Sequence, residues 1–258
     1  SSLKQIMKSE RLILPLSPQE RHEITKFSLF MFLMGISGFL ASQVNILILG
    51  MFSGSSEVGA YSIANSVASI IAFPLIALNN IFPANVSELY AQKAIGLISD
   101  LYKKLTRMIL SLSLIPFSVF ILYPRDVMAI FGDDFTQGGG ALSILAFSQL
   151  VNVGVGSAGY ILAMTGKEKW EFINQAILAF MNVALAIPLT RSFGITGIAI
   201  ATAFSIIAVN LMRLIEVKLI HGFHPYDVSY FKLIILGAVT LIALKAMSYI
   251  LPFGAPIR

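Results

Sequence analysis

Long apolar stretches alternate with short polar segments along most of the 258-residue chain. A helix needs about 20 predominantly apolar residues to cross a hydrocarbon core of roughly 30 Å. Seven stretches are long enough, and they cover residues 27–52, 58–86, 105–123, 141–165, 172–190, 195–215 and 231–251. Gly- and Ser-rich turns and charged connectors separate them. The pattern predicts an all-α protein, a polytopic membrane helix bundle with about seven transmembrane helices.

The composition supports this interpretation. Hydrophobic residues make up 57% of the chain and charged residues 12%, against roughly 45–50% and about 25% in soluble domains. A soluble protein of this size needs more charge to cover its surface, so we expect lipid around the helices. The chain has no cysteine, which excludes disulfides, thiolate nucleophiles and cysteine-ligated metal sites.

The basic residues predict the orientation, because cytoplasmic loops carry the excess of Lys and Arg. On one side they are Lys4, Lys8, Arg11, Arg21, Lys26, Lys93, Lys103, Lys104, Arg107, Lys167, Lys169, Arg213, Lys218 and Lys232. The opposite side holds only Arg125, Arg191 and Arg258, and Lys245 lies inside the last stretch. The count predicts a cytoplasmic amino-terminal end. This topology is opposite to that of a seven-helix receptor, whose amino terminus is external. The cytoplasmic loops also account for the excess of basic over acidic residues in the chain, so no nucleic-acid partner is needed to explain it.

The acidic residues all fall in predicted loops or at helix ends, Glu57, Glu88, Glu171 and Glu216 among them. Ion-coupled carriers usually place carboxylates inside the bundle, so that device is not expected here. His22, His221 and His224 lie in predicted cytoplasmic loops, where we expect them to be solvated. No set of nucleophile, base and oxyanion donors can be assembled. We therefore expect no enzyme, no metal site and no cofactor.

Uncharged polar and small residues form stripes at helical spacing in three of the stretches. They are Ser62, Asn65, Ser66 and Ser69; Gly38, Ser42 and Asn45, with Gln43 adjacent; and Ser148, Asn152, Gly156 and Gly159, with Gln149 adjacent. One interpretation is packing and hydrogen bonding between helices. The other is the wall of a hydrated cavity. Three such stripes together favour a polar lumen.

Several motifs, in their order and spacing, resemble the oligosaccharide flippases. They are LNNIFPANVSELYAQ at 78–92, FGDDF at 131–135, LSILAFSQLVNVGVGSAGYILAMTGKEK at 142–169 and FGITGIAIATAFS at 193–205. The superfamily also contains multidrug and toxin extrusion antiporters and lipid II flippases. The resemblance runs from the SLFMFLMGISG opening at 28–38 to GFHPY at 222–226.

The resemblance implies a two-lobed, inverted-V transporter fold, with a central cavity between two six-helix halves. This chain looks like the second half, so the missing amino-terminal half of the same protein would be its partner. Residues 1–26 would be the cytoplasmic linker between lobes, 27–220 the six-helix lobe, and 221–258 a cytoplasmic loop plus an additional transmembrane helix. The family often has an acidic residue where this chain has Asn45. Without that carboxylate, the resemblance does not imply ion binding at this position.

The implied function is flipping of lipid-linked oligosaccharide or polysaccharide precursors across the cell membrane of a bacterium or archaeon, by alternating access. The partners would be that substrate and membrane lipid. The candidate wall residues are Gln43, Asn45, Ser62, Asn65, Ser69, Gln149 and Asn152. Lys245 is a weaker candidate for contact with a phosphate. The alternatives are an ion-coupled multidrug extruder of the same fold and, from another class, a seven-helix sensor or receptor.

Overall fold

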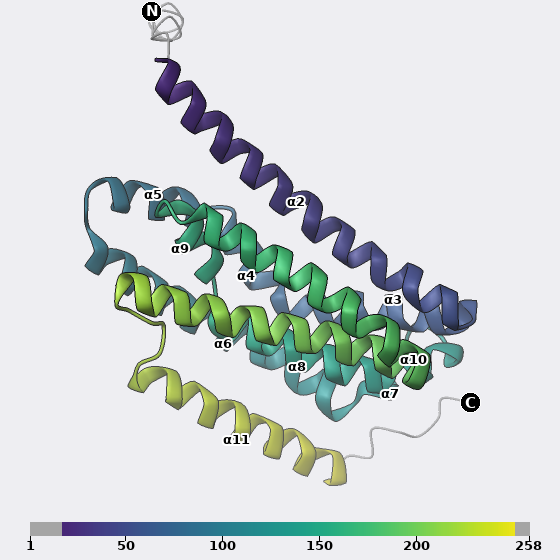
Figure 1. The fold of residues 1–258 in the computed structure, drawn as a ribbon. Helices are drawn as coiled ribbons and strands as arrows, with labels where there is room; N and C mark the ends of the chain where they lie inside the picture. Colours follow the sequence, from purple (N-terminus) through teal and green to yellow (C-terminus); the bar gives the residue numbers. More distant parts are fainter. Residues whose placement is uncertain (1–16, 251–258) are drawn as a thin grey trace, which may run out of the picture.

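The structure, a computed structural model, describes residues 17–250, and this part of the chain is helical without strands (Figure 1). The predicted all-α membrane helix bundle is therefore confirmed. Four described segments are long and apolar enough to cross a membrane, namely Ser55–Asn79, Ile95–Leu122, Asp133–Val155 and Glu168–His221. Gln43–Phe52 and Val228–Ala243 are shorter apolar helical segments. The number of seven spans stays a prediction.

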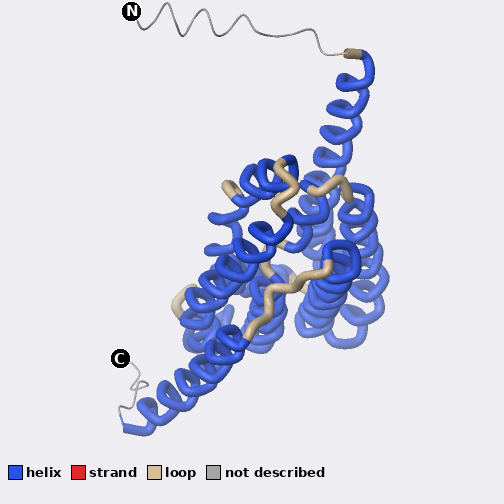
Figure 2. Tube along the Cα trace, turned by 90° about the vertical axis from the view of Figure 1, so that its left-hand side faces the viewer, coloured by secondary structure: helices blue, strands red, loops and turns tan. Residues whose placement is uncertain are grey.

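Helix α2, Pro18–Phe52, is a single long helix. It begins ahead of the predicted span and runs through the predicted boundary between residues 26 and 27. Its second part packs mainly against α10, whereas its first part extends beyond the rest of the bundle (Figures 1 and 2). Residues 1–16 of the predicted linker lie outside the described residues.

The second apolar stretch is divided into several helices. It forms α3, Ser55–Ser69, a 3-10 turn, Ile70–Ala72, and α4, Phe73–Asn79. A separate helix, α5, Phe82–Ala91, follows. The prediction of one span over 58–86 was wrong at its end. Pro74 and Pro83 lie in the first turns of α4 and α5, where the missing amide hydrogen costs no hydrogen bond and a new helix starts readily.

Helix α6, Ile95–Leu122, leads back through the bundle with Pro116 in its interior. It also takes up part of the segment predicted as a connector. The loop at its end contains α7, Pro124–Ala129, and a 3-10 helix, Asp133–Gly138. A compact loop made of these two short helices therefore connects the end of α6 to the start of α8.

The fourth apolar stretch was predicted as one span over 141–165, and it is broken. Helix α8, Gly139–Val155, ends at Gly156, and α9, Ala158–Met164, follows. Gly156 has φ 71° and ψ −148°, a conformation that only glycine adopts readily. A Cβ at Gly156 would lie 2.5 Å from Thr106 Oγ1 of α6. The break thus coincides with a close approach of two helices.

Helix α10, Glu168–His221, contains two predicted spans in one element. At Gly194, with φ 53° and ψ −130°, the chain reverses, so that two antiparallel arms lie side by side (Figure 1). A Cβ at Gly197 would overlap the Leu189 carbonyl of the other arm. The FGITG sequence therefore supplies glycine where the turn requires it.

Helix α11, Val228–Ile250, lies on the outside of the bundle against α6 (Figure 1). The helices pack around one main apolar core that includes Leu49, Tyr61, Leu142 and Ile198. A smaller core joins α5, α9 and the adjoining ends of α6 and α10 around Phe82 and Tyr102. Large apolar side chains also cover the outer surface, as expected for helices surrounded by lipid.

Candidate functional site

Two polar cavities open inside the apolar bundle, one uncharged and one charged. The first, which we call the neutral cavity, has a volume of about 210 Å³. Its lining residues are Asn45, Asn65, Ser69, Gln149, Leu178, Asn182, Thr202, Ser205 and Ile206. They come from α2, α3, α8 and both arms of α10. The fold therefore gathers polar residues that are far apart in the sequence around one space.

A hydrogen-bond network forms one wall of the neutral cavity. Asn182 Nδ2 donates to Asn45 Oδ1 at 2.8 Å, and Asn45 Nδ2 donates to Thr202 Oγ1 at 3.0 Å. The Tyr61 hydroxyl lies 3.1 Å from the same Thr202 oxygen. These four side chains are buried, so their mutual hydrogen bonds compensate for the water they have lost. The Asn182 Oδ1 atom, however, has no hydrogen-bond partner among the described residues.

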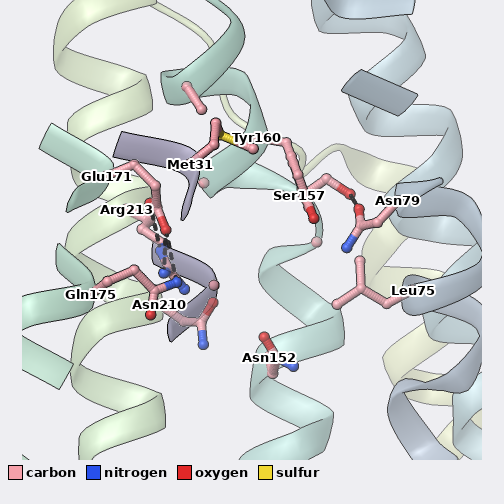
Figure 3. A pocket seen from close by; sticks show the side chains of 14 residues that line it. Met31, Leu75, Asn79, Asn152, Ser157, Tyr160, Glu171, Gln175, Asn210 and Arg213 are labelled. Carbon is pink, nitrogen blue, oxygen red and sulfur yellow. Dashed lines mark hydrogen bonds and ion pairs between the residues drawn. The ribbon is translucent and has the colours of Figure 1, made fainter. Parts of the chain in front are cut away.

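The second space, the charged cavity, has a volume of about 300 Å³ (Figure 3). Its polar lining residues are Asn79, Asn152, Ser157, Tyr160, Glu171, Gln175, Asn210 and Arg213. They come from α4, α8, the break between α8 and α9, α9 and the two arms of α10, close to the ends of those arms. Asn152 Nδ2 donates to Gln149 Oε1 at 3.2 Å, and this contact links the two cavities along α8.

An ion pair crosses between the two arms of α10 in the charged cavity. Arg213 donates to Glu171 through both Nε, at 2.9 Å, and a terminal nitrogen, while Gln175 donates to the same carboxylate at 3.1 Å (Figure 3). The side chains of Arg213 and Glu171 are 12% and 6% exposed. Such a two-pronged pair is strong and directional, and it orients the guanidinium group at the cavity wall.

The surroundings of this ion pair are tightly packed. A Cβ at Gly159 of α9 would lie 2.8 Å from Glu171 Oε2, so the carboxylate rests directly against the α9 backbone. On the adjacent turn, Asn174 donates to Glu216 at 2.5 Å. On the opposite wall, Ser157 donates to Asn79 Oδ1 at 2.6 Å (Figure 3). The wall of the charged cavity is thus held by bonds between the two arms of α10 and between α4 and the residue ahead of α9.

Five of the eight residues proposed from the sequence line one or the other of the two cavities. Asn45, Asn65, Ser69 and Gln149 line the neutral cavity, and Asn152 lines the charged one. Ser62 lines a separate surface groove with Ser66 and Phe131. Gln43 and Lys245 are exposed on α2 and α11 and line neither cavity. The role of all eight in transport stays a prediction.

Sequence reasoning missed several residues of both cavities. Asn182 and Thr202 were overlooked, and Glu171 and Arg213 were treated as loop or helix-end charges, which concealed their burial. A signal was present, because Glu171, Asn174 and Gln175 share one helical face, as do Asn210 and Arg213. These two polar faces can contact each other only if the chain reverses between them, and the sequence pattern does not show that reversal.

The expectation of solvated loop histidines was wrong for His221. Its ring nitrogen Nε2 lies 2.9 Å from Thr165 Oγ1, and the ring stacks on Phe223 with centroids 5.8 Å apart. The side chain is half-buried. His221 therefore ties the end of α10 to the end of α9. Among the described residues there is no group of three or more His, Asp or Glu side chains that could hold a metal ion.

Comparison with known proteins gives three findings. The sequence profile of a family described as "Polysaccharide biosynthesis protein" matches residues 3–137. A protein named "Probable low-salt glycan biosynthesis flippase Agl15", from Haloferax volcanii, is 30% identical over 189 residues, which cover 71% of this chain and 39% of that protein. The chain thus spans less than half the length of this curated relative.

The fold is also similar to a solved structure, "Lipid II flippase MurJ, inward closed conformation". The TM-score is 0.55 at 15% sequence identity, and the match covers 95% of this chain and 58% of that one. At this identity the similarity concerns the fold alone. The bundle therefore has the helix arrangement of a flippase-type membrane transporter.

Proposed function

The chain belongs to the family of polysaccharide biosynthesis proteins, and on that basis we propose that it is one lobe of a flippase. Its substrates are lipid-linked oligosaccharide or polysaccharide precursors, which it moves across the cell membrane by alternating access. The 30% identical relative carries the name of a glycan biosynthesis flippase. Because this chain matches only part of that relative's length, the proposal concerns the full-length parent protein, in which a second lobe completes the cavity.

One observation supports this proposal most directly: the neutral cavity is lined by amide and hydroxyl side chains inside an apolar bundle. A sugar cannot cross hydrocarbon unaided, because each unsatisfied polar group costs several kcal/mol there. Side chains such as Asn65, Ser69 and Gln149 replace water around the sugar hydroxyls. The lipid tail remains in the bilayer, and rocking of the two lobes transfers the headgroup.

We also propose an orientation and a location. The distribution of basic residues favours a cytoplasmic position, at the cell membrane, for the amino-terminal end of this segment and for the Glu171–Arg213 end of α10. The proposal assigns transport and not catalysis to the protein. Multidrug extrusion and receptor functions are not favoured, since the family and the 30% identical relative are both connected with polysaccharide or glycan biosynthesis.

The proposal is tested in the full-length parent protein with Asn65→Leu combined with Asn152→Leu. We expect severe loss of glycan export with normal insertion and folding. Hydrogen bonds between membrane helices average only about 0.6 kcal/mol, so the structural cost is small. Substrate hydroxyls left unpaired would cost roughly 1–3 kcal/mol each. The measurement is the appearance of lipid-linked or exported glycan on the outer face.

Asn85→Leu is the matched control, because it makes the same change at an exposed amide of α5 that lies outside both cavities. It should leave export unchanged. Expression and thermal stability are measured for both variants. Normal export by a stable Asn65→Leu/Asn152→Leu protein would show that these amides do not line the substrate path.

A further inference from the structure

The break between α8 and α9 leaves the last carbonyl groups of α8 without the partners that a continuous helix would supply. Gly156 still donates its amide to the Asn152 carbonyl at 3.0 Å, but the helix does not continue past it. The carbonyls of Gly154 and Val155 lie at the break, deep in the bundle, where both residues are buried. In such surroundings an unsatisfied backbone group is costly.

Two tyrosines from other helices supply the missing donors. The Tyr102 hydroxyl of α6 donates to the Val155 carbonyl at 2.6 Å, and the Tyr230 hydroxyl of α11 donates to the Gly154 carbonyl at 3.0 Å. Tyr102 is 1% and Tyr230 7% exposed. Two successive carbonyls are therefore held from two directions by buried phenols, one of them on the outermost helix.

The surroundings of Tyr230 are adapted to this contact. A Cβ at Gly154 would lie 2.9 Å from the Tyr230 hydroxyl oxygen, so a side chain at this position would displace the hydroxyl. Tyr226 packs edge-on against the Tyr230 ring, with centroids 4.7 Å apart. Asp227, just before α11, lies 3.1 Å from Arg107 of α6 in an ion pair. These contacts fix the start of α11 at the height of the break.

The break also lies in the wall of the charged cavity. Asn152 precedes it, Ser157 and Gly159 follow it, and all three line that cavity. Ser157 bonds to Asn79 at 2.6 Å, and Gly159 supports the Glu171 carboxylate. A change in the bend at Gly156 would move these two groups of lining residues relative to each other.

We propose that Tyr102 and Tyr230 are positioning residues for the charged cavity: their hydroxyls hold the α8–α9 break in one bend and so set the position of the cavity wall. Helix α11, which the family resemblance places outside the six-helix lobe, thereby controls the geometry of a site that it does not line. Only the transport part of this inference rests on the proposed function; the structural part stands independently of it.

The test measures the bend directly in the full-length protein. Because this part of the chain has no cysteine, spin labels can be placed at Gly140→Cys on α8 and Lys169→Cys at the start of α10, with any cysteines of the other lobe removed. Both positions are exposed, and the α8–α9 break lies between them. Electron spin resonance then gives the distribution of distances between the labels, with and without Tyr230→Phe.

Tyr230→Phe should broaden or shift this distribution. The population of a second bend should rise roughly threefold to tenfold, the size that loss of one hydrogen bond supports. Tyr102→Phe should act in the same direction. Tyr226→Phe is the matched control: it removes a neighbouring phenol hydroxyl whose oxygen makes no hydrogen bond within the described residues, and the distribution should stay as in the unaltered protein.

A distance distribution that is the same for Tyr230→Phe, Tyr226→Phe and the unaltered protein would overturn the inference, whatever the effect on stability. Glycan export, measured in parallel, should fall for Tyr230→Phe and not for Tyr226→Phe. If the distances change as expected but the unaltered protein exports no glycan, the positioning role stands and the proposed function fails.

Discussion

Glu171 and Arg213 show how strongly burial changes the weight of a single ion pair. Both side chains are at most 12% exposed, so each needs the other to compensate for its lost hydration. Removing one partner of a buried pair is therefore far more damaging than removing both. The pair of Arg107 and Asp227 is about one third exposed, at 33% and 34%, so solvent screens its charges more strongly.

We predict that Arg213→Met destabilises the protein by about 3–5 kcal/mol, because Glu171 is left buried and unpaired. The double variant Glu171→Met/Arg213→Met should regain most of this loss. Arg107→Met is the control, with an expected cost of about 0–1 kcal/mol. Thermal unfolding of the purified protein measures all three. Equal destabilisation by the single and double variants would contradict the assigned pairing.

Residues of the neutral cavity were partly predictable. Asn65 and Ser69 share a helical face, a pattern visible in the sequence, and both line the cavity. Gln43 was included only because it is adjacent to such a stripe, and it points outward. Asn182 lies two turns beyond Gln175 on the same helical face, but only the packing of α10 against α2 brings it to Asn45.

At the scale of helices, glycines and prolines decide where an apolar stretch is one helix or two. Gly156 breaks the stretch at 139–164, and Gly194 reverses the chain inside Glu168–His221. Pro116 and Pro188, in contrast, remain within helices. Hydropathy alone does not distinguish the residues that break a helix from those that remain within one, because glycine and proline both occur in long apolar segments. The distinction depends on backbone conformation and on the neighbours that contact the break.

We predict that Gly194→Ala lowers stability by about 1–3 kcal/mol, the cost of holding a residue with a side chain in a backbone conformation that favours glycine. Its Cβ would also lie 3.0 Å from Glu57 Oε2. Gly96→Ala is the control, since that glycine lies in α6 with open space around it, where alanine should be neutral or slightly stabilising. Thermal unfolding compares them. An unchanged unfolding temperature for Gly194→Ala would refute the requirement for glycine.

At the scale of the whole molecule, the antiparallel course of the helices assigns the loops to two ends. The start of α6 and both ends of α10 lie at one end of the bundle, whereas α7 and the turn at Gly194 lie at the other (Figure 1). Because the loops with many Lys and Arg residues belong to the first end, the charge count and the fold agree on which loops share a side. The charge rule then predicts that this side is cytoplasmic.

We predict that Lys103→Cys is accessible only from the cytoplasm and Asp133→Cys only from outside. Helix α6, Ile95–Leu122, separates the two positions and is long enough to cross the bilayer. A membrane-impermeant thiol reagent, applied to intact cells and to inverted vesicles, measures each site in full-length protein with no other cysteine. Labelling of position 103 in intact cells would reverse the topology.

Taken by itself, the sequence determined the membrane environment, the helical class and the grouping of basic loops, because these depend on local hydropathy and charge. It also indicated a polar interior, since the stripes of Asn and Ser are periodic along single helices. Only the tertiary structure decided which polar groups meet. The Glu171–Arg213 pair exists because α10 reverses at Gly194, and the hydroxyl of Tyr230 reaches Gly154 because α11 packs against α6. Such contacts between distant segments depend on packing, which leaves no periodic pattern in the sequence.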